Sequence, residues 1–184
     1  MALVRDAHCH SCGAAFSDTS TYPRVCAQCK AQVWANPIPV SVVLVPVRHQ
    51  GRVGLLVVRR SIEPKKGLLA LVGGFLEEHE TWQQGGAREV REETDVVIDH
   101  TSLVPFWFTS TEPRPNRVLL FSTATEMDAS ALPVFTATNE TSERGLVFGP
   151  EGLEAVFAFP LHIEAVRRFF AARGITGAHE FITV

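Results

Sequence analysis

Three carboxylates lie close together in the segment GGFLEEHETWQQGGAREVREETDVV, residues 73–97: Glu89, Glu92 and Glu93. On a helix, which turns by about 100° per residue, Glu89 and Glu93 lie one turn apart and Glu92 falls within the same arc. Like charges at this spacing destabilise a helix by about a few tenths of a kcal/mol per pair. A divalent cation reverses that sign, because Mg²⁺ and Mn²⁺ prefer oxygen ligands and bind carboxylates together with phosphates. The spacing alone leaves two alternatives, a metal site and a solvated acidic helix face.

All four cysteines lie in the first 29 residues, as two Cys-x2-Cys pairs separated by thirteen residues. Two such pairs are typical of a tetrathiolate zinc site. The alternatives are two disulfides or redox motifs, and the N-terminus, which lacks the apolar core of a signal peptide, disfavours the disulfides. We therefore predict a zinc ribbon over residues 1–35 whose structural Zn²⁺ supplies the folding free energy. Its ligands would be Cys9, Cys12, Cys26 and Cys29.

The composition limits the remaining possibilities. With 184 residues, 46% of them apolar and 20% charged, the chain fits one ordinary domain with a small appendage. A net charge of −3 and no run of five like charges argue against a broad nucleic-acid or membrane surface. No apolar segment reaches the length of a membrane span. We therefore expect a cytoplasmic protein that binds neither membranes nor nucleic acid.

The clustered carboxylates are expected on a helix that runs from Thr81 to Thr94. Thr81 can cap this helix, and Gln84 three residues later completes a Thr-x-x-Gln capping box. Gly85 and Gly86 are unexpected inside a helix, where each costs about 1 kcal/mol relative to alanine. Close packing of the helix against a sheet would explain them.

Apolar and β-branched segments on both sides of this helix predict strands. The segment NPIP at 36–39 is expected to form a rigid hinge ahead of them, because each proline fixes its own φ and keeps its predecessor extended. Residues 125–145 are predicted to be a long irregular stretch. The predicted strands are 40–47 and 52–59 as a hairpin, 68–72 ended by Gly73 and Gly74, 96–108, 117–125 and 146–148, and the predicted C-terminal helices are 151–157 and 161–173.

A longer pattern surrounds the carboxylates. Glu80 follows Gly74 after five residues, and REVREETDV at 88–96 follows Glu80 after seven more. This arrangement resembles the Nudix box, G-x5-E-x7-R-E-U-x-E-E-x-G-U with U a bulky aliphatic residue, at eight of its nine specified positions. Asp95 stands where the family has glycine; that position favours the left-handed conformation, so we expect a modest stability cost. The resemblance implies an α/β fold, a Nudix α/β/α sandwich with a mixed sheet, over residues 36–184.

The resemblance extends beyond the box. The four-cysteine ribbon, NPIPVSVVLVPV and RRSIEPKKGLLALVGGFLEEHE together are similar to the Nudix hydrolases with an N-terminal zinc ribbon, which split NADH, FAD or ADP-ribose. NADH pyrophosphatases carry a Ser-Gln-Pro-Trp motif downstream of the box, where this chain has FTSTEPRPNRVLL at 108–120. The implied activity is Mg²⁺-dependent (or Mn²⁺-dependent) hydrolysis of the pyrophosphate bond of a nucleoside diphosphate-linked metabolite to two monophosphates. FAD, ADP-ribose or another nucleoside-diphosphate substrate is favoured over NADH.

Several residue roles follow from the resemblance. Glu89, Glu92 and Glu93 would bind about two or three Mg²⁺ ions that bridge phosphate oxygens and activate a water. The carbonyl of Gly73 is a further candidate ligand, because glycine lets the backbone approach an ion closely. Arg88 is expected to hold the carboxylates in place through bidentate contacts.

The base that accepts the proton of the water is either Glu92 or Glu140. Glu140 is a candidate because NETSERGLVF is similar to the strand-leading segment that carries an extra metal-binding or catalytic glutamate in several relatives. Glu143 competes with it for this role, and either residue could be an ordinary loop carboxylate. Glu80 is expected to orient Arg88 or the loop rather than to bind metal.

Other residues are candidates for contacts with the nucleotide substrate. Phe75 and the aromatic run Phe106–Phe108 could stack on a base or an isoalloxazine, although strand aromatics are more often core residues. Arg114 and Arg117 could bind phosphate, the alternative being solvated surface arginines.

Three other functions are considered. Removal of a nucleotide cap from RNA would use the same chemistry but needs a basic path, which the composition does not show. A non-catalytic nucleotide-sensing regulator should have lost its box carboxylates, whereas all three are present. A nucleic-acid-binding ribbon would need interleaved basic and aromatic residues, which are few. The ribbon is instead expected to shape the rim of the active site or the interface of a homodimer.

Overall fold

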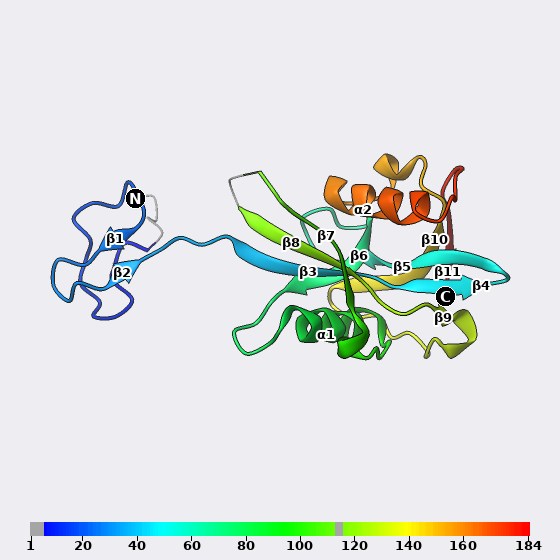
Figure 1. Cartoon of the computed structure of the whole chain (residues 1–184), viewed down its shortest axis with the longest axis horizontal. Helices are drawn as coiled ribbons and strands as arrows, with labels where there is room; N and C mark the ends of the chain where they lie inside the picture. Colours follow the sequence, from blue (N-terminus) through cyan, green and yellow to red (C-terminus); the bar gives the residue numbers. More distant parts are fainter. Residues whose placement is uncertain (1–5, 113–115) are drawn as a thin grey trace. The chain divides into compact units, whose positions relative to one another are not determined.

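The structure, a computed structural model, describes residues 6–112 and 116–184 (Figure 1). Contacts within the chain divide it into two units, Met1–Pro37 and Ile38–Val184. Each unit has its own strands and its own packing. In the described part of the chain, no helix is long and apolar enough to cross a membrane.

The first unit is built around two similar turns. In one, the N–H of Gly13 donates to the carbonyl of Cys9 at 2.8 Å. In the other, the N–H of Lys30 donates to the carbonyl of Cys26 at 3.0 Å. Gly13 and Lys30 both adopt the left-handed conformation, with φ of 75° and 65°. Each turn therefore brings the two cysteines of one pair to the same side. A short antiparallel pair of strands flanks the second turn, with β1 (Arg24–Val25) before it and β2 (Gln32–Val33) after it.

Arg24 occupies the interior of the first unit. Arg24 is 6% exposed, and its guanidinium lies 4.0 Å from the ring centroid of Tyr22 and 5.9 Å from that of Phe16. The guanidinium also donates to backbone carbonyl groups. A charged side chain between two rings takes the position that an apolar core would fill, so the unit buries little apolar surface.

The second unit is a mixed sheet with a helix on each face. The strand order is β11-β10-β5-β6-β3-β8-β7, with β4 beside β5 and β9 beside β4. The pairs β3–β8 and β4–β9 are parallel, whereas the other pairs are antiparallel. The strands are β3 (Ile38–Leu44), β4 (Pro46–His49), β5 (Arg52–Arg60), β6 (Leu69–Phe75), β7 (Val104–Ser110), β8 (Arg117–Thr123), β9 (Met127–Asp128), β10 (Thr141–Phe148) and β11 (Glu180–Thr183), and the helices are α1 (Trp82–Thr94) and α2 (Pro160–Ala171).

Two apolar cores separate the layers, and Figure 1 shows α1 and α2 on opposite sides of the sheet. Val43 of β3 packs in the core that contains Val90 of α1, whereas its neighbour Val42 packs in the core that contains Phe169 of α2. Successive side chains of a strand point to opposite faces, so one strand contributes to both cores. The predicted α/β/α sandwich with a mixed sheet is confirmed.

Strand β6 changes partners along its length. Leu69–Leu71 pair with β5, and Val72–Phe75 pair with β3. The prediction that Gly73 and Gly74 end this strand is wrong, because the strand continues to Phe75. Glycine is needed there for close approach: a Cβ at Gly73 would lie 2.3 Å from the carbonyl oxygen of Ser41 on β3.

Helix α1 begins and ends as its sequence predicts. Thr81 is the N-cap and forms the capping box with Gln84, each side chain accepting from the backbone N–H of the other residue. At the other end, Asp95 is in the left-handed conformation with φ of 61°. The cap positions therefore fix the length of the helix that carries the three carboxylates.

The two glycines inside α1 lie where the helix meets its neighbours. A Cβ at Gly86 would lie 2.9 Å from Oγ of Ser41 and 2.9 Å from Cγ2 of Val43, both on β3. A Cβ at Gly85 would lie 2.5 Å from Cδ2 of Leu76, in the loop that leads into the helix. Gly86 thus confirms the predicted close packing on the sheet, whereas Gly85 makes room for the loop.

Several segments differ from the prediction. Residues 151–157 form only the short 3₁₀ helix η3 (Leu153–Ala155), because Gly152 ahead of it has φ of 74° and interrupts a regular helix. The predicted strand 96–108 begins only at Val104, after the 3₁₀ helix η1 (His100–Ser102). Strand β10 begins within the stretch predicted to be irregular, and β11 was not predicted.

Candidate active site and cysteine cluster

Arg88 lies at the centre of the carboxylates of α1. Its Nε and Nη2 donate to the two carboxylate oxygens of Glu80 at 3.0 and 2.7 Å, a bidentate pair. Its Nη1 donates to Oε1 of Glu89 at 2.7 Å and to Oε2 of Glu92 at 3.2 Å. A further bond from Nη2 to the carbonyl of Phe75, at 3.0 Å, joins the helix to the end of β6. Glu80 therefore orients Arg88, and Arg88 orients Glu89 and Glu92.

Glu89 lies directly over the backbone of β6. A Cβ at Gly74 would lie 2.4 Å from Oε1 and 2.6 Å from Oε2 of Glu89, so the first glycine of the box leaves space for this carboxylate. Burial raises the pKa of Glu89; Arg88 opposes this rise, and the charges of Glu92 and Glu140 add to it. The acid is therefore held where its ionised form is incompletely compensated.

The pKa of Glu93 is perturbed more strongly than that of Glu89. Oε2 of Glu93 accepts from the backbone N–H of Gly73 at 3.2 Å. Burial raises the pKa of Glu93 to about 8, and the charges of Glu89 and Glu140 push it in the same direction. The contact with Gly73 is through the amide; a metal contact through the carbonyl of Gly73 stays a prediction. Two neighbouring acids that resist ionisation form the kind of site that a cation stabilises.

Glu140 and Glu143 have different surroundings. Glu143 forms an ion pair with Arg59 and accepts a hydrogen bond from Oγ1 of Thr183. These hydrogen bonds lower the pKa of Glu143, and the bond from Thr183 has the larger effect. Glu140 lies just before β10, and its charge acts on both Glu89 and Glu93. Of the two competitors, Glu140 is the one whose charge acts on the carboxylates of α1.

Two of the predicted substrate contacts lie together at one end of the sheet. Phe75 is 51% exposed, and the guanidinium of Arg117 lies 5.5 Å from its ring centroid. Arg114 lies outside the described residues. Phe108 is 76% exposed, whereas Trp107 stacks on Phe121 with 5.1 Å between ring centroids.

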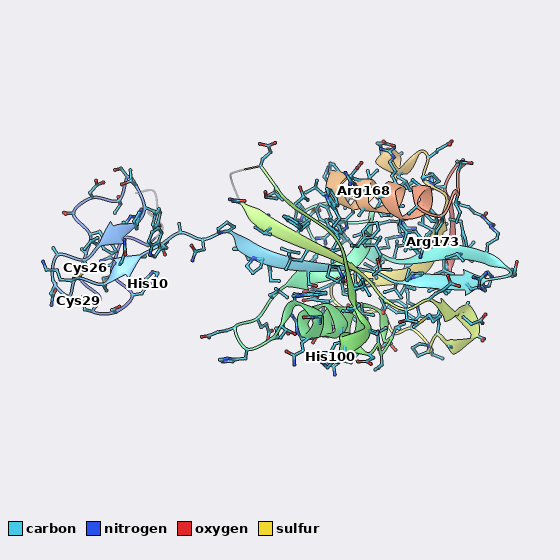
Figure 2. All side chains as sticks on the ribbon, viewed as in Figure 1. His10, Cys26, Cys29, His100, Arg168 and Arg173 are labelled. Carbon is cyan, nitrogen blue, oxygen red and sulfur yellow. The ribbon has the colours of Figure 1, made fainter. Side chains whose placement is uncertain are left out.

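Trp107 also contacts a side chain of α2. Arg168, which Figure 2 labels on α2, places its guanidinium 4.4 Å from the ring centroid of Trp107. Trp107 is thus a packing residue between β8 and α2, as strand aromatics usually are.

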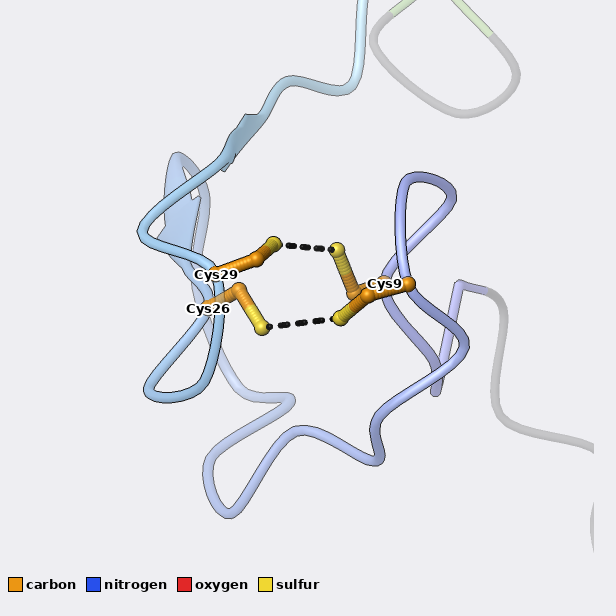
Figure 3. A group of neighbouring side chains, drawn as sticks. Cys9, Cys26 and Cys29 are labelled. Atoms are coloured by element: carbon orange, nitrogen blue, oxygen red, sulfur yellow. Dashed lines mark hydrogen bonds between the residues drawn. The ribbon is translucent and has the colours of Figure 1, made fainter.

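The four cysteines converge in the first unit (Figure 3). The sulfur atoms of Cys9 and Cys29 are 3.7 Å apart, those of Cys12 and Cys26 are 3.6 Å apart, and all four lie within 4.8 Å of one another. A tetrahedral zinc ion with bonds of about 2.3 Å to sulfur requires about 3.8 Å between sulfurs. The donor set and its spacing therefore fit a tetrathiolate metal site.

Backbone amides favour the thiolate at two of the four cysteines, whereas the side chain of Cys29 is the main cause that raises the pKa of Cys12 to about 12. A hydrogen bond from the backbone of Cys29 is the main cause that lowers the pKa of Cys26 to about 6, and one from the backbone of Ser11 lowers the pKa of Cys9. Among residues 6–112 and 116–184, this is the one group of three or more such donors gathered within 4.8 Å. The carboxylates of α1 are less tightly gathered because Arg88 lies between Glu89 and Glu92.

Sequence reasoning missed Arg144 and His162, and for Asp95 it missed the partner. Arg144 of β10 is 2% exposed and donates to the carbonyl of Thr94 at the end of α1. His162 of α2 accepts from the N–H of Leu71 on β6 at 3.1 Å. Asp95 contacts a distant loop. The one signal in the sequence was Arg144 itself, a charged residue directly before an apolar segment.

Comparison with known proteins gives the same fold. A NUDIX hydrolase from Nitrosomonas europaea is 22% identical, with 94% of this chain and 96% of that chain covered and a TM-score of 0.63. The NUDIX domain of Shewanella oneidensis NrtR, solved in complex with ADP ribose, is 21% identical, with 76% and 90% covered and a TM-score of 0.63. A bifunctional NMN adenylyltransferase/ADP ribose pyrophosphatase from Francisella tularensis, complexed with AMP and a Mn ion, is 21% identical, with 75% and 42% covered and a TM-score of 0.56.

The family itself is shown by a sequence model. The model of the NUDIX domain matches residues 37–169, which include all of α1 and the strands around it. The matched region contains Arg88, Glu89, Glu92 and Glu93 in the arrangement described above. The chain therefore belongs to the NUDIX domain family and is a Nudix hydrolase.

Proposed function

We propose that the protein hydrolyses the pyrophosphate bond of a nucleoside diphosphate-linked metabolite, of the FAD, ADP-ribose or NADH class, to two monophosphates, and that it requires Mg²⁺ or Mn²⁺. One observation carries this proposal: Glu89 and Glu93 lie against β6 with raised pKa values, beside Glu92 and Glu140. Such a site needs a cation, and a diphosphate needs one as well.

Glu89, Glu92 and Glu93 would bind the metal ions, together with the carbonyl of Gly73. Bound there, Mg²⁺ or Mn²⁺ would neutralise the diphosphate and lower the pKa of the attacking water. Arg88 keeps Glu89 and Glu92 aimed at the same point, because one of its nitrogens donates to both.

The proton of the attacking water needs an acceptor. Glu92, whose side chain is 49% exposed, and Glu140 are the two candidates. Glu143 is a weaker candidate because it is already paired with Arg59. The proton passes to the carboxylate as the water oxygen bonds to phosphorus, and the bridging oxygen leaves with the other phosphate.

Phe75 and Arg117 are proposed to bind the substrate. The ring of Phe75 is exposed enough to stack on a base, and Arg117 beside it can bind a phosphate. Arg114 is proposed for the same role. The ADP ribose and the AMP with Mn in the two relatives described above support a nucleotide ligand, and the absence of the Ser-Gln-Pro-Trp motif disfavours NADH.

The first unit is proposed to be a structural zinc ribbon, residues 1–35, ahead of a hydrolase domain, residues 36–184. The sulfur spacing fits Zn²⁺. Because the unit buries few apolar side chains, the metal would supply its folding free energy.

The test is a panel of FAD, ADP-ribose, NADH, NAD⁺ and dinucleoside polyphosphates, each with Mg²⁺ or Mn²⁺, with products identified by mass. We expect two monophosphates from FAD or ADP-ribose and no turnover without the metal. Glu93→Gln serves as the inactive control. Release of a cap from RNA with no turnover of the panel would replace the proposal, and binding without turnover would indicate a sensing regulator.

A further inference from the structure

Asp95 makes a contact that glycine, the family residue at this position, could not make. Its carboxylate Oδ2 accepts from the backbone N–H of Thr136 at 2.8 Å. The two residues are separated by 41 positions, so the bond joins the C-terminal end of α1 to the segment that precedes β10. The contact has an energetic cost, because the backbone of Asp95 is in the left-handed conformation, φ 61°, which glycine adopts more easily.

Arg144 fastens the same segment to the same helix end. Its Nη1 donates to the carbonyl of Thr94 at 2.7 Å and its Nη2 to the carbonyl of Pro133 at 2.8 Å. The charge of Asp95 acts on this guanidinium. Two links, one from a carboxylate and one from a buried guanidinium, therefore hold residues 133–136 against the end of α1.

The segment from Thr136 to Glu140 has little freedom beyond these links. Oγ1 of Thr138 accepts from the N–H of Glu140 at 3.2 Å and from the N–H of Thr141 at 3.0 Å. The N–H of Ser61 donates to the carbonyl of Glu140 at 2.7 Å. The position of Glu140 is thus set at one end by Ser61, the residue that follows β5, and at the other by the attachment of Thr136.

We propose that Asp95 is a positioning residue: its carboxylate anchors residues 133–140 to the end of α1 and thereby holds Glu140 beside Glu89 and Glu93. The role of Glu140 in turnover rests on the proposed hydrolysis. The anchoring itself does not, so the two can be tested separately.

The chain offers a substitution that separates positioning from stability. Asp95→Gly removes the acceptor but relieves the left-handed backbone, so the helix end should be as stable as before or more stable. Asp95→Asn retains an acceptor oxygen and tolerates the same backbone. We expect Asp95→Gly to lower kcat about tenfold or more with little change in KM and no fall in Tm, because a small displacement of a reacting group is costly. Asp95→Asn should remain near the wild type.

Asp99→Gly is the matched control. Oδ1 of Asp99 also accepts from a backbone N–H, that of Thr101 at 2.9 Å, but this bond is local and lies in η1. We expect normal turnover from this variant. Equal losses in Asp95→Gly and Asp99→Gly would overturn the proposal.

A double substitution tests whether Asp95 acts through Glu140. In a Glu140→Gln background, Asp95→Gly should cause no further loss of kcat, because the group that it positions is already inactive. A further tenfold loss in that background would overturn the proposal.

Hydrogen exchange gives a readout that does not need turnover. Asp95→Gly should speed exchange of the amide of Thr136 and of the peptide 133–140 by about tenfold or more, and Asp95→Asn should not. Unchanged exchange in Asp95→Gly would overturn the anchoring. If the wild type hydrolyses no substrate of the panel, the proposed function fails, and the exchange experiment still decides whether Asp95 anchors the segment.

Discussion

Gly74 and Glu89 are in contact across the interface between β6 and α1, with only 2.4 Å between Oε1 of Glu89 and the position that a Cβ on Gly74 would occupy. Gly74→Ala should therefore displace the carboxylate and lower turnover about 100-fold. It should also destabilise the fold by about 1–3 kcal/mol through overpacking. Steady-state kinetics and denaturant unfolding measure the two effects.

The same substitution in a Glu89→Ala background provides the control. With the carboxylate removed, the added methyl group has space, so Gly74→Ala should no longer be destabilising. An equal loss of stability in both backgrounds would show that the strand itself, rather than Glu89, requires glycine.

Glu93→Gln should separate stability from activity. The pKa of Glu93, about 8, lies above the unfolded value, so ionisation costs stability as the pH rises from about 4.5 to 8. Without added Mg²⁺ at pH 8, the variant should be more stable than the wild type by about 1 kcal/mol, which is about 2–4 °C in Tm. Its turnover should fall by about 100-fold or more.

Glu92→Gln is the companion variant, because Glu92 is the more exposed of the two adjacent glutamates. We expect a similar loss of turnover but no gain in stability. Added Mg²⁺ or Mn²⁺ should raise the Tm of the wild type more than that of either variant. Near-normal turnover of both variants would exclude the carboxylate metal site.

The cysteine cluster predicts one tightly bound zinc per chain, measured by elemental analysis of protein purified under reducing conditions. Cys26→Ser should reduce this content to well below one, because three ligands remain. His10→Ala is the control: His10 is a spare donor that pairs with Asp6 at 3.2 Å, so its removal should leave the zinc content unchanged. A wild-type protein with no zinc would exclude the metal ribbon.

His162 predicts a dependence of stability on pH. Burial, with the charge of Arg60 adding to it, lowers the pKa of His162 to about 3. The unfolded chain binds this proton near pH 6.5, so the free energy of unfolding should fall as the pH drops from about 6.5 towards 3, by up to about 1.4 kcal/mol per unit.

The substitution His162→Asn keeps an acceptor for the N–H of Leu71 but removes the group that titrates. The His162→Asn variant should lose stability at neutral pH through poorer packing and show a shallower pH dependence of unfolding. His79→Asn, at a side chain that is 92% exposed, should leave that dependence as it is in the wild type. Parallel curves for wild type and His162→Asn would contradict the prediction.

Local signals were sufficient to predict α1. The capping box at Thr81 and Gln84 and the spacing of Glu89 and Glu93 lie within one element, so the sequence specifies them directly. The packing of Gly86 was also indicated, because a helical glycine has an energetic cost that a close contact explains.

The contacts around Asp95 and His162 could not be predicted in this way. Asp95 meets Thr136 across 41 positions, and His162 meets Leu71 across 91. Such pairs depend on how the sheet and its helices assemble, which no local pattern records. The predicted end of β6 is too early for a related reason. Its two glycines suggest the end of a strand, but in the structure they allow β3 and α1 to approach β6 closely.

The change of partners within β6 has a consequence for folding. Because Leu69–Leu71 belong to the ladder with β5 and Val72–Phe75 to the ladder with β3, the two groups of strands share one member. We expect that unfolding of either group would disorder the seven residues of β6, and that this would break the hydrogen bonds of the other group as well. The hydrolase unit is therefore expected to melt cooperatively, as one all-or-none transition.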